Sequence, residues 1–522
     1  MHNRVGLALA FALTLTFQPV SAADSGGRAR NVILMVADGA GHNTWTATSM
    51  YQGTLGEEFY DSGDWVRLAA STHPLRRAME PPVSKDRGTV QVPSFVFDPR
   101  RAWDPTPVEG SHGKYPYHFA GYKWLHDMRP DSANTATSML SGVKTYNGSV
   151  NVDGAGNPME GTIASLARSL GMRVGTVTDV LFPHATPVAG SGVHHEDRRA
   201  YCPLAIEMLT RGRLDLIVGC GHPDFDNNGE PLGDDAKREY RYVGGSATWN
   251  LLAGKGDLAA GDRVCTEIEE QAVTLDADQV AELKRWTLAD DRKQIEKLVR
   301  GETPDRLLVV PTIGEAALPS GQPDDDGEPG QVAVGGTLQQ QRGSRADPHF
   351  TPPGYDPPIE TVPSLATLTR VALNAVDDDP EGFFLLVEGG AIDWAMHENQ
   401  LGRMIEETIG FKDAVRVVTD WVDARDGWDE TLVVVVADHD QMLWGPSSET
   451  VPFDPLVDNG AGELPSYRWL SDTHSNLLVP LYARGVGAER FEDLADGEDP
   501  FYGRYVDHTD IHTVFEAVLA GR

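Results

Sequence analysis

Acidic and imidazole side chains directly follow several short apolar runs of this sequence. Three runs share the arrangement, and the groups after them are Asp38, Glu388, and the adjacent pair Asp438 and His439. If the runs are parallel strands of an open α/β sheet, their carboxyl ends meet at one edge, where such sheets bind ligands. One such ending is unremarkable. Three together predict a metal cluster, because carboxylate and imidazole groups are common ligands of divalent metals.

A second group of candidate metal ligands surrounds Asp393. Asp393 and His397 are four residues apart, so a helix places both side chains on one face. A carboxylate and an imidazole at that spacing suit zinc, which accepts nitrogen and oxygen ligands in tetrahedral sites. His474 lies just before a further apolar run and could complete the site. A lone pair of this kind is a surface or hydrogen-bonded core feature in about two cases of three.

A candidate nucleophile lies in the segment of small residues that follows Pro130. The segment is typical of a helix start, which places Ser132 near the helix N-terminus. There the free N–H groups and the helix dipole favour an alkoxide and a bound phosphate. On the local sequence alone, a simple N-cap role for Asp131 or Ser132 is the stronger interpretation.

The elements that must position these groups follow an alternating pattern. Short apolar, β-branched runs predict buried parallel strands. They are Val32–Val36, Val174–Val177, Leu214–Val218, Leu307–Val310, Phe383–Val387, Leu432–Val436 and Leu477–Tyr482. Helical patterns such as Leu365–Ala375 and Met404–Val422 lie between many of them. The alternation predicts a doubly wound, mostly parallel α/β sheet flanked by helices.

Three stretches break this alternation and predict insertions or long loops on an α/β domain of residues 30–522. They are residues 64–118, 223–262 and 320–358. Within the second, Asp224–Asp235 imitates a calcium-binding EF-hand loop, but Pro231 interrupts it, so an acidic solvated turn is the favoured interpretation. The ligand-like residues Asp507–His512 lead into an amphipathic helix, so we predict helix capping there.

The first 22 residues are typical of a cleavable secretory signal. They combine a basic start, a short apolar run and a small-residue end. No later stretch is long and apolar enough for a transmembrane helix, so we expect a soluble periplasmic or secreted protein. In an oxidising compartment one pair among Cys202, Cys220 and Cys265 could form a disulfide, and the sequence does not select the pair.

The formal net charge of −34 excludes whole classes of partner. It repels nucleic acid and anionic lipid, so we expect neither as a ligand. It also repels an anionic substrate, so a phosphate site must supply local positive charge through metal ions and an arginine. The excess of acidic residues is also consistent with adaptation to high salt.

Six segments together resemble the motifs of alkaline phosphatases, in the order of that family. They are Asn31–Gly41, Asp131–Gly148, His184–Pro187, Val387–His397, Thr431–His439 and Thr473–Gly485. One such motif would be weak evidence, whereas six in order are highly specific. The resemblance implies hydrolysis of phosphate monoesters to an alcohol and inorganic phosphate through a covalent phosphoserine.

The resemblance also implies a role for each motif residue. Ser132 is the implied nucleophile, and Arg198 is the implied phosphate-binding guanidinium, which Asp131 positions. Arg199 is adjacent, and aligning this loop with the family requires an insertion. The implied metal ligands are Asp38, Asp438 and His439 for one zinc ion, Asp393, His397 and His474 for a second, and Asp38, Thr186 and Glu388 for a third ion, usually magnesium.

The sequence departs from the family pattern near the third metal. His184 and Trp394 stand where some bacterial members have an acidic and a basic residue, respectively. This combination resembles a subset that includes cold-adapted bacterial enzymes. Because imidazole is a good zinc ligand, a third zinc is an alternative to magnesium. Ala37 and Ser475 replace glycines that are common in the family.

Other functions compete with this interpretation. A sulfatase or phosphodiesterase of the wider superfamily shares the aspartate ligands. A sulfatase, however, needs a Cys/Ser-x-Pro-x-Arg site that is missing at the nucleophile position, and a two-zinc diesterase would not need Thr186 and Glu388. A non-catalytic metal- or phosphate-binding relative would lack Ser132 or part of the ligand set. Alkaline phosphatases are often homodimers, and the sequence leaves the assembly open.

Overall fold

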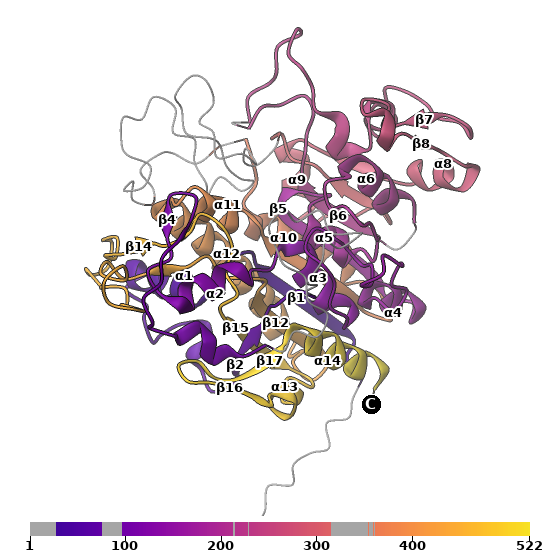
Figure 1. The fold of residues 1–522 in the computed structure, drawn as a ribbon. Coiled ribbons are helices and arrows are strands. Elements are labelled where there is room, and N and C mark those ends of the chain that lie inside the picture. The colour runs from indigo at the N-terminus through magenta and orange to yellow at the C-terminus, as the bar shows by residue number, and fades with distance from the viewer. Residues whose placement is uncertain are drawn as a thin grey trace, which may run out of the picture.

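A mixed sheet of 11 strands forms the centre of the computed structural model (Figure 1). The structure describes residues 28–75, 97–211, 214–227, 229–314, 353, 359 and 361–521 of the chain. From one edge to the other, the strands are β16 (Gly497–Asp499), β17 (Gly503–Asp507), β2 (Val66–Ser71), β15 (Val479–Gly485), β12 (Thr431–Ala437), β1 (Asn31–Ala37), β11 (Phe383–Gly389), β5 (Arg173–Leu181), β6 (Leu216–Cys220), β10 (Leu307–Val309) and β9 (Thr287–Ala289).

The seven strands from β12 to β9 are all parallel to one another. Every residue of β1, β11 and β12 is buried, so both faces of the sheet are covered at its centre. A strand buried on both faces requires a continuous apolar sequence, which is why these segments lack polar alternation. The predicted fold class, a mostly parallel α/β sheet flanked by helices, is confirmed.

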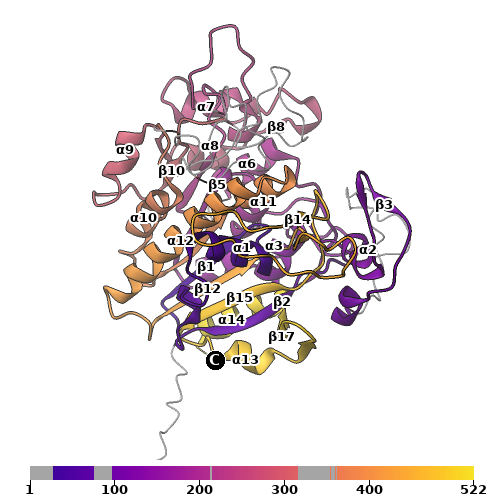
Figure 2. The same cartoon turned by 90° about the vertical axis from the view of Figure 1, so that its left-hand side faces the viewer.

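Two groups of helices cover the two faces of the sheet (Figures 1 and 2). The first group is α1 (His42–Gln52), α10 (Leu365–Val376), α11 (Ala391–His397) and α12 (Leu401–Asp423), and the second is α3 (Ser132–Ser141), α4 (Ile163–Ser169), α5 (Ala185–Gly190) and α14 (His508–Ala520). In the first group, α12 packs against the other three helices. In the second, α3 packs against α14 and α5, and α14 also packs against α4.

Smaller elements surround this body. Three separate two-stranded sheets pair β3 with β4, β7 with β8, and β13 with β14. The elements are β3 (Ser111–His112), β4 (Tyr115–Pro116), β7 (Arg263–Val264), β8 (Val273–Thr274), β13 (Leu443–Trp444), β14 (Arg468–Trp469), α2 (Ala120–Asp127), α6 (Tyr201–Thr210), α7 (Ser246–Leu252), α8 (Ala277–Leu283), α9 (Arg292–Lys297) and α13 (Arg490–Leu494).

The prediction that the run at Leu477–Tyr482 is a parallel strand was wrong. This run forms β15, which pairs antiparallel with β12 on one side and with β2 on the other. An apolar run reports burial, whereas strand direction is set by the connection that leads into it. Because β15 is reversed, it begins at the edge where the parallel strands end. His474, which precedes β15, therefore lies at that edge.

The ranges expected to be insertions differ in content. Residues 64–118 contribute β2 to the main sheet and also carry the β3–β4 pair, and residues 223–262 include α7. Residues 320–358, except Pro353, and the predicted signal segment lie outside the described residues. Among the described residues, none of the helices combines the length and apolar composition that a bilayer crossing requires.

Two local predictions about ligand-like segments can be compared with the structure. In the acidic segment 224–235, Asp224 forms an ion pair with Arg238, and Asp226 accepts a backbone hydrogen bond from Glu230. These contacts are those of an acidic turn. At the C-terminal segment, Asp507 is the N-cap of α14 and forms a capping box with Asp510, which confirms the predicted capping role.

A disulfide joins Cys202 on α6 to Cys265 beside β7, and the buried Cys220 is not part of it. The bond closes a loop of 63 residues in sequence and so restricts the unfolded chain.

Replacing Cys202 and Cys265 together by alanine should lower the free energy of unfolding by about 2–4 kcal/mol, because the unfolded chain regains the entropy of that loop. Thermal and denaturant unfolding measure the change. The matched control is Cys220→Ala, which should keep a reductant-sensitive melting temperature. The expectation would be contradicted if the melting temperature of the unmodified chain were the same with and without reductant.

Candidate active site

The carboxyl edge of β1 and β12 carries the first predicted group of metal ligands. Asp38 directly follows β1, and Asp438 and His439 directly follow β12, so the parallel pairing of these strands brings all three together. Nε2 of His439 lies 3.3 Å from Oδ1 of Asp38 and 3.3 Å from Oδ2 of Asp438. The Asp38 carboxylate is fully buried, and neither of its oxygens has a hydrogen-bond partner among the described residues. A buried carboxyl group in this state must be neutralised, either by a proton or by a cation.

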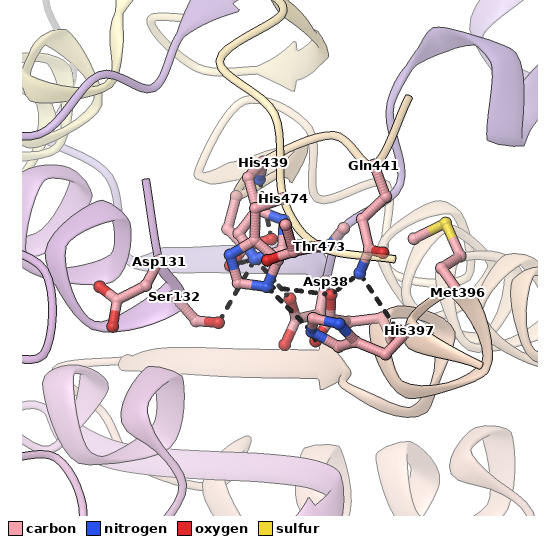
Figure 3. A network of polar contacts seen from close by, with 12 residues as sticks. Asp38, Asp131, Ser132, Met396, His397, His439, Gln441, Thr473 and His474 are labelled. Carbon is pink, nitrogen blue, oxygen red and sulfur yellow. Dashed lines mark hydrogen bonds and ion pairs between the residues drawn. The ribbon is translucent and has the colours of Figure 1, made fainter. Parts of the chain in front are cut away.

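The second predicted group lies beside the first (Figure 3). Nε2 of His397 lies 3.3 Å from Oδ2 of Asp393, and Nε2 of His474 lies 3.4 Å from Oδ1 of Asp393. The Nδ1 atoms of His397 and His474 contact the backbone carbonyls of Asp472 at 2.7 Å and Pro130 at 2.9 Å. When Nδ1 donates its proton to a carbonyl, Nε2 keeps a lone pair for a metal. The group therefore offers one oxygen and two nitrogen atoms that could hold a metal ion.

A third group shares Asp38 with the first. Ligand atoms of Asp38, His184 and Glu388 all lie within 4.8 Å of one another. Thr186 is fully buried on α5, two residues after His184. The ring of Trp394 meets the ring of His184 edge-on at 5.7 Å between centroids, so this indole walls the group and supplies no ligand.

Burial and mutual repulsion perturb the carboxyl groups of these clusters. Burial, followed by the charges of Asp438 and Asp393, holds the pKa of Asp38 well above its usual range. Burial raises the pKa of Asp438 to about 6 and, against a hydrogen bond from Thr178, that of Glu388 to about 8. So many carboxylates are stable together in the ionised form only if cations lie among them.

Ser132 is the first residue of α3 and lies against the first group. Its Oγ is 3.5 Å from Nε2 of His439. The N-cap of α3 is Asp131, whose Oδ1 accepts a hydrogen bond of 3.0 Å from the backbone N–H of Asn134. The N-cap interpretation therefore holds for Asp131, and it leaves the Ser132 hydroxyl free to face the metal ligands.

Arg198 points into the same region from the loop between α5 and α6. Its Nη1 donates to Oδ2 of Asp131 at 3.1 Å, and its Nη2 lies 2.7 Å from Nε2 of His184. Burial and the Arg198 charge hold the pKa of His184 well below its usual range, so the imidazole is neutral and accepts this hydrogen bond. The neighbouring Arg199 is exposed. The structure thus brings together every side chain that the sequence proposed for the site.

Several supporting residues were missed by the sequence reasoning. The side-chain amide of Gln441 donates to both the carboxylate and the backbone carbonyl of Asp393. The Thr178 hydroxyl donates to Oε2 of Glu388 at 2.5 Å. Gln441 stands two residues after His439, a position that could have been suspected. By contrast, the role of Thr178 follows only from the register of β5 with β11.

Comparisons with known proteins agree with this geometry. The sequence model of a family described as alkaline phosphatase matches residues 112–238 and 341–455. An alkaline phosphatase of Escherichia fergusonii is 26% identical over 389 residues, which cover 72% of this chain and 73% of the relative. The rat tissue-nonspecific isozyme is 25% identical over 486 residues, covering 90% of this chain and 72% of the relative. The structure of the alkaline phosphatase from the Antarctic bacterium TAB5 superposes with a TM-score of 0.53 at 18% identity, over 95% of this chain and 99% of that one.

The fold and the three ligand groups define a metal-binding hydrolase whose site lies at the carboxyl edge of a doubly wound sheet. The comparisons make this class specific. The chain is related to the alkaline phosphatases in sequence and in fold, and it is a phosphatase.

Metal uptake should depend on pH through His397. Burial alone would lower the pKa of this imidazole, but the Asp393 carboxylate raises it to about 9. In the metal-free protein, His397 is therefore protonated below about pH 9, and a metal ion must displace that proton. The apparent affinity for Zn²⁺ should rise about tenfold per pH unit from pH 6.5 up to about 9 and then level off, as measured by competition with a metal indicator. An affinity that is flat across this range would contradict the assignment.

Replacing Gln441 by leucine should weaken metal binding at the Asp393 group by about 10–100-fold, because the carboxylate loses the amide that orients it. Metal content after dialysis against a chelator, together with kcat, measures the effect. Unchanged retention of metal would show that Gln441 does not hold Asp393 in its binding geometry.

Proposed function

We propose that this phosphatase hydrolyses phosphate monoesters through a covalent phosphoserine at Ser132, with two zinc ions and a third ion, magnesium, as cofactors. The observation that carries the proposal is the position of Ser132, whose Oγ lies 3.5 Å from a nitrogen of His439 and hence beside the Asp38, Asp438 and His439 group. A serine hydroxyl is a weak nucleophile until a base or a metal removes its proton. This position gives the hydroxyl that activation.

The chain's own groups account for binding of the phosphoryl group. Ser132 lies at the N-terminus of α3, where free backbone N–H groups favour the negative charge of a phosphate. Arg198 offers a planar pair of donors that suits two phosphoryl oxygens. Asp131 aligns this guanidinium and, by accepting the N–H of Gly148, ties it to the backbone.

The reaction then has two displacements at phosphorus. In the first, the Ser132 oxygen forms a bond to phosphorus as the ester bond to the alcohol breaks, and the alcohol takes up a proton. In the second, water forms a new P–O bond, the bond to Ser132 breaks, and inorganic phosphate leaves while the serine regains its proton. When bound, the zinc ions would supply Lewis-acid stabilisation of the entering and departing oxygens.

The ligand chemistry supports zinc in the two imidazole-containing groups. Asp38, Asp438 and His439 would hold one ion, and Asp393, His397 and His474 the other, since zinc prefers such mixed nitrogen and oxygen sets. Because each group offers three ligand atoms, a bound zinc ion would have a coordination position left for substrate.

The contact between Arg198 and His184 supports magnesium as the third ion. If His184 Nε2 accepts the hydrogen bond from Arg198, the Nδ1 atom carries the proton and cannot bind a metal. The remaining donors, Asp38, Glu388 and Thr186, are all oxygens, which magnesium prefers. A variant of the TAB5 enzyme, with aspartate in place of a histidine, is described with magnesium bound in its M3 site. Zinc would replace magnesium here only if His184 released Arg198.

Further properties follow from the same assignment. We propose a secreted or periplasmic enzyme: the signal-like segment 1–22 supports this location, and so does the Cys202–Cys265 disulfide, since such bonds persist in oxidising compartments. The substrates we propose are small phosphate monoesters. A homodimer is the assembly to test first.

Ser132→Ala should abolish formation of the phosphoenzyme and lower kcat at least 1,000-fold, because no other hydroxyl takes the place of the nucleophile. Rapid quenching with a ³²P-labelled monoester detects the covalent intermediate. Ser138→Ala, which removes a buried hydroxyl of the same helix that bonds only to the backbone, is the control and should stay labelled. Near-normal turnover by Ser132→Ala would contradict the mechanism.

The same preparation tests the alternatives. Turnover of p-nitrophenyl phosphate should exceed that of bis-p-nitrophenyl phosphate by a wide margin. A wide preference for the diester would instead establish a phosphodiesterase, and bound metal without any turnover would establish a non-catalytic relative.

A further inference from the structure

Helix α11, which carries Asp393 and His397, has no side-chain cap from its own segment. Its N-cap residue is Gly390, which has no side chain to accept hydrogen bonds from the N–H groups of the first turn. Oδ1 of Asp179 accepts these hydrogen bonds instead, at 2.7 Å from the N–H of Gly390 and 3.1 Å from that of Ala391. Asp179 belongs to β5 and is only 2% exposed. A residue more than 200 positions away therefore caps the helix.

The turn that Asp179 caps is closely surrounded. A Cβ atom on Gly390 would meet a side-chain carbon of Val180 at 2.6 Å, and one on Gly389 would meet Phe411 at 2.8 Å. The carbonyl of Gly389 also accepts the N–H of Asp38 at 3.2 Å. Packing contacts thus restrict the turn on the sides of Val180 and Phe411. We infer that the hydrogen bonds from Gly390 and Ala391 to Asp179 set the direction in which α11 leaves the turn.

Asp179 is itself held from two elements. Its neighbour Thr178 is paired with Glu388 in the register of β5 and β11 and donates its hydroxyl to the Glu388 carboxylate. The Asp179 side chain also shares a hydrogen bond with the buried Glu407 of α12. Consecutive residues of β5 thus hold the third-metal carboxylate and the start of the helix that bears two ligands of the second zinc site.

We propose that Asp179 is a positioning residue that places Asp393 and His397 for metal binding by capping α11 from strand β5. This role rests on the proposed metal-dependent function. Without an acceptor at this position, two buried N–H groups would be unsatisfied, and the short helix would tilt or fray at the turn that precedes Asp393. His474 and Gln441, which lie on other segments, would stay in place, so the Asp393, His397 and His474 group would lose its mutual geometry.

The test compares three variants at one position. Asp179→Asn keeps a side-chain oxygen for the two N–H groups and an amide that can donate to Glu407, whereas Asp179→Val and Asp179→Ala keep no acceptor. Thr176→Val is the matched control, since it lies on the same strand, is equally buried, and loses a hydroxyl that has no hydrogen-bond partner among the described residues. Circular dichroism establishes folding. Competition of Zn²⁺ with a metal indicator gives affinity, and the visible absorption of the Co²⁺-substituted protein reports ligand geometry.

We expect Asp179→Val to weaken the zinc site on α11 by about 10–100-fold and to change the cobalt spectrum, while Asp179→Asn and Thr176→Val stay within about threefold of the unmodified protein. If Asp179→Val does not fold, the comparison of Asp179→Ala with Asp179→Asn decides in the same way. The proposal is overturned if the acceptor-free variants bind zinc normally, or if Asp179→Asn loses as much affinity as they do.

A separate measurement distinguishes failure of the site from failure of the positioning role. His397→Ala should lower the zinc content of the otherwise unmodified protein by one ion. If the zinc content is unchanged, the zinc site on α11 is itself wrong, and the role of Asp179 is overturned with it.

Discussion

The site depends on one electrostatic constraint: four buried carboxyl groups face one another at the end of the parallel strands. Asp38, Glu388, Asp393 and Asp438 are each at most 3% exposed. Burial alone disfavours their ionised forms, and mutual repulsion adds to that cost for Asp38, Glu388 and Asp438. At Asp393, by contrast, the neighbouring His397 and His474 outweigh burial and hold the pKa well below its usual range. The buried strands β1, β11 and β12 hold these groups close together. Metal cations bound among them would offset this electrostatic cost.

The strongly negative chain makes local positive charge more important. With a net charge of −34, the molecule repels the anionic phosphate esters of its proposed reaction. Arg198 is the guanidinium that we propose meets this need, and its two partners have different effects on it. Asp131 fixes its orientation, whereas His184 accepts a hydrogen bond in the neutral state. The imidazole thereby adds no positive charge of its own and leaves the third group of ligands dependent on oxygen donors.

The sequence predicted the parts of the fold that depend on local pattern. The central strands β1, β11 and β12 are uniformly apolar, so their burial and the ligands that follow them could be inferred directly. The direction of β15 could not, because an apolar run has the same composition in either orientation. The disulfide partner of Cys202 was equally hidden, since it depends on how the α7–β7 region folds back. Thr178 and Asp179 act through register and turn geometry, which no spacing rule encodes.

The reversed strand β15 also connects two parts of the site. It brings His474 to the ligand edge, where the imidazole is hydrogen-bonded to the carbonyl of Pro130, directly before Asp131 and Ser132. A candidate metal ligand is thus hydrogen-bonded to the backbone that leads into the proposed nucleophile. Any loosening of the chain before α3 would therefore displace His474 as well as Ser132. The second ligand group and the proposed nucleophile share one anchoring point in the backbone.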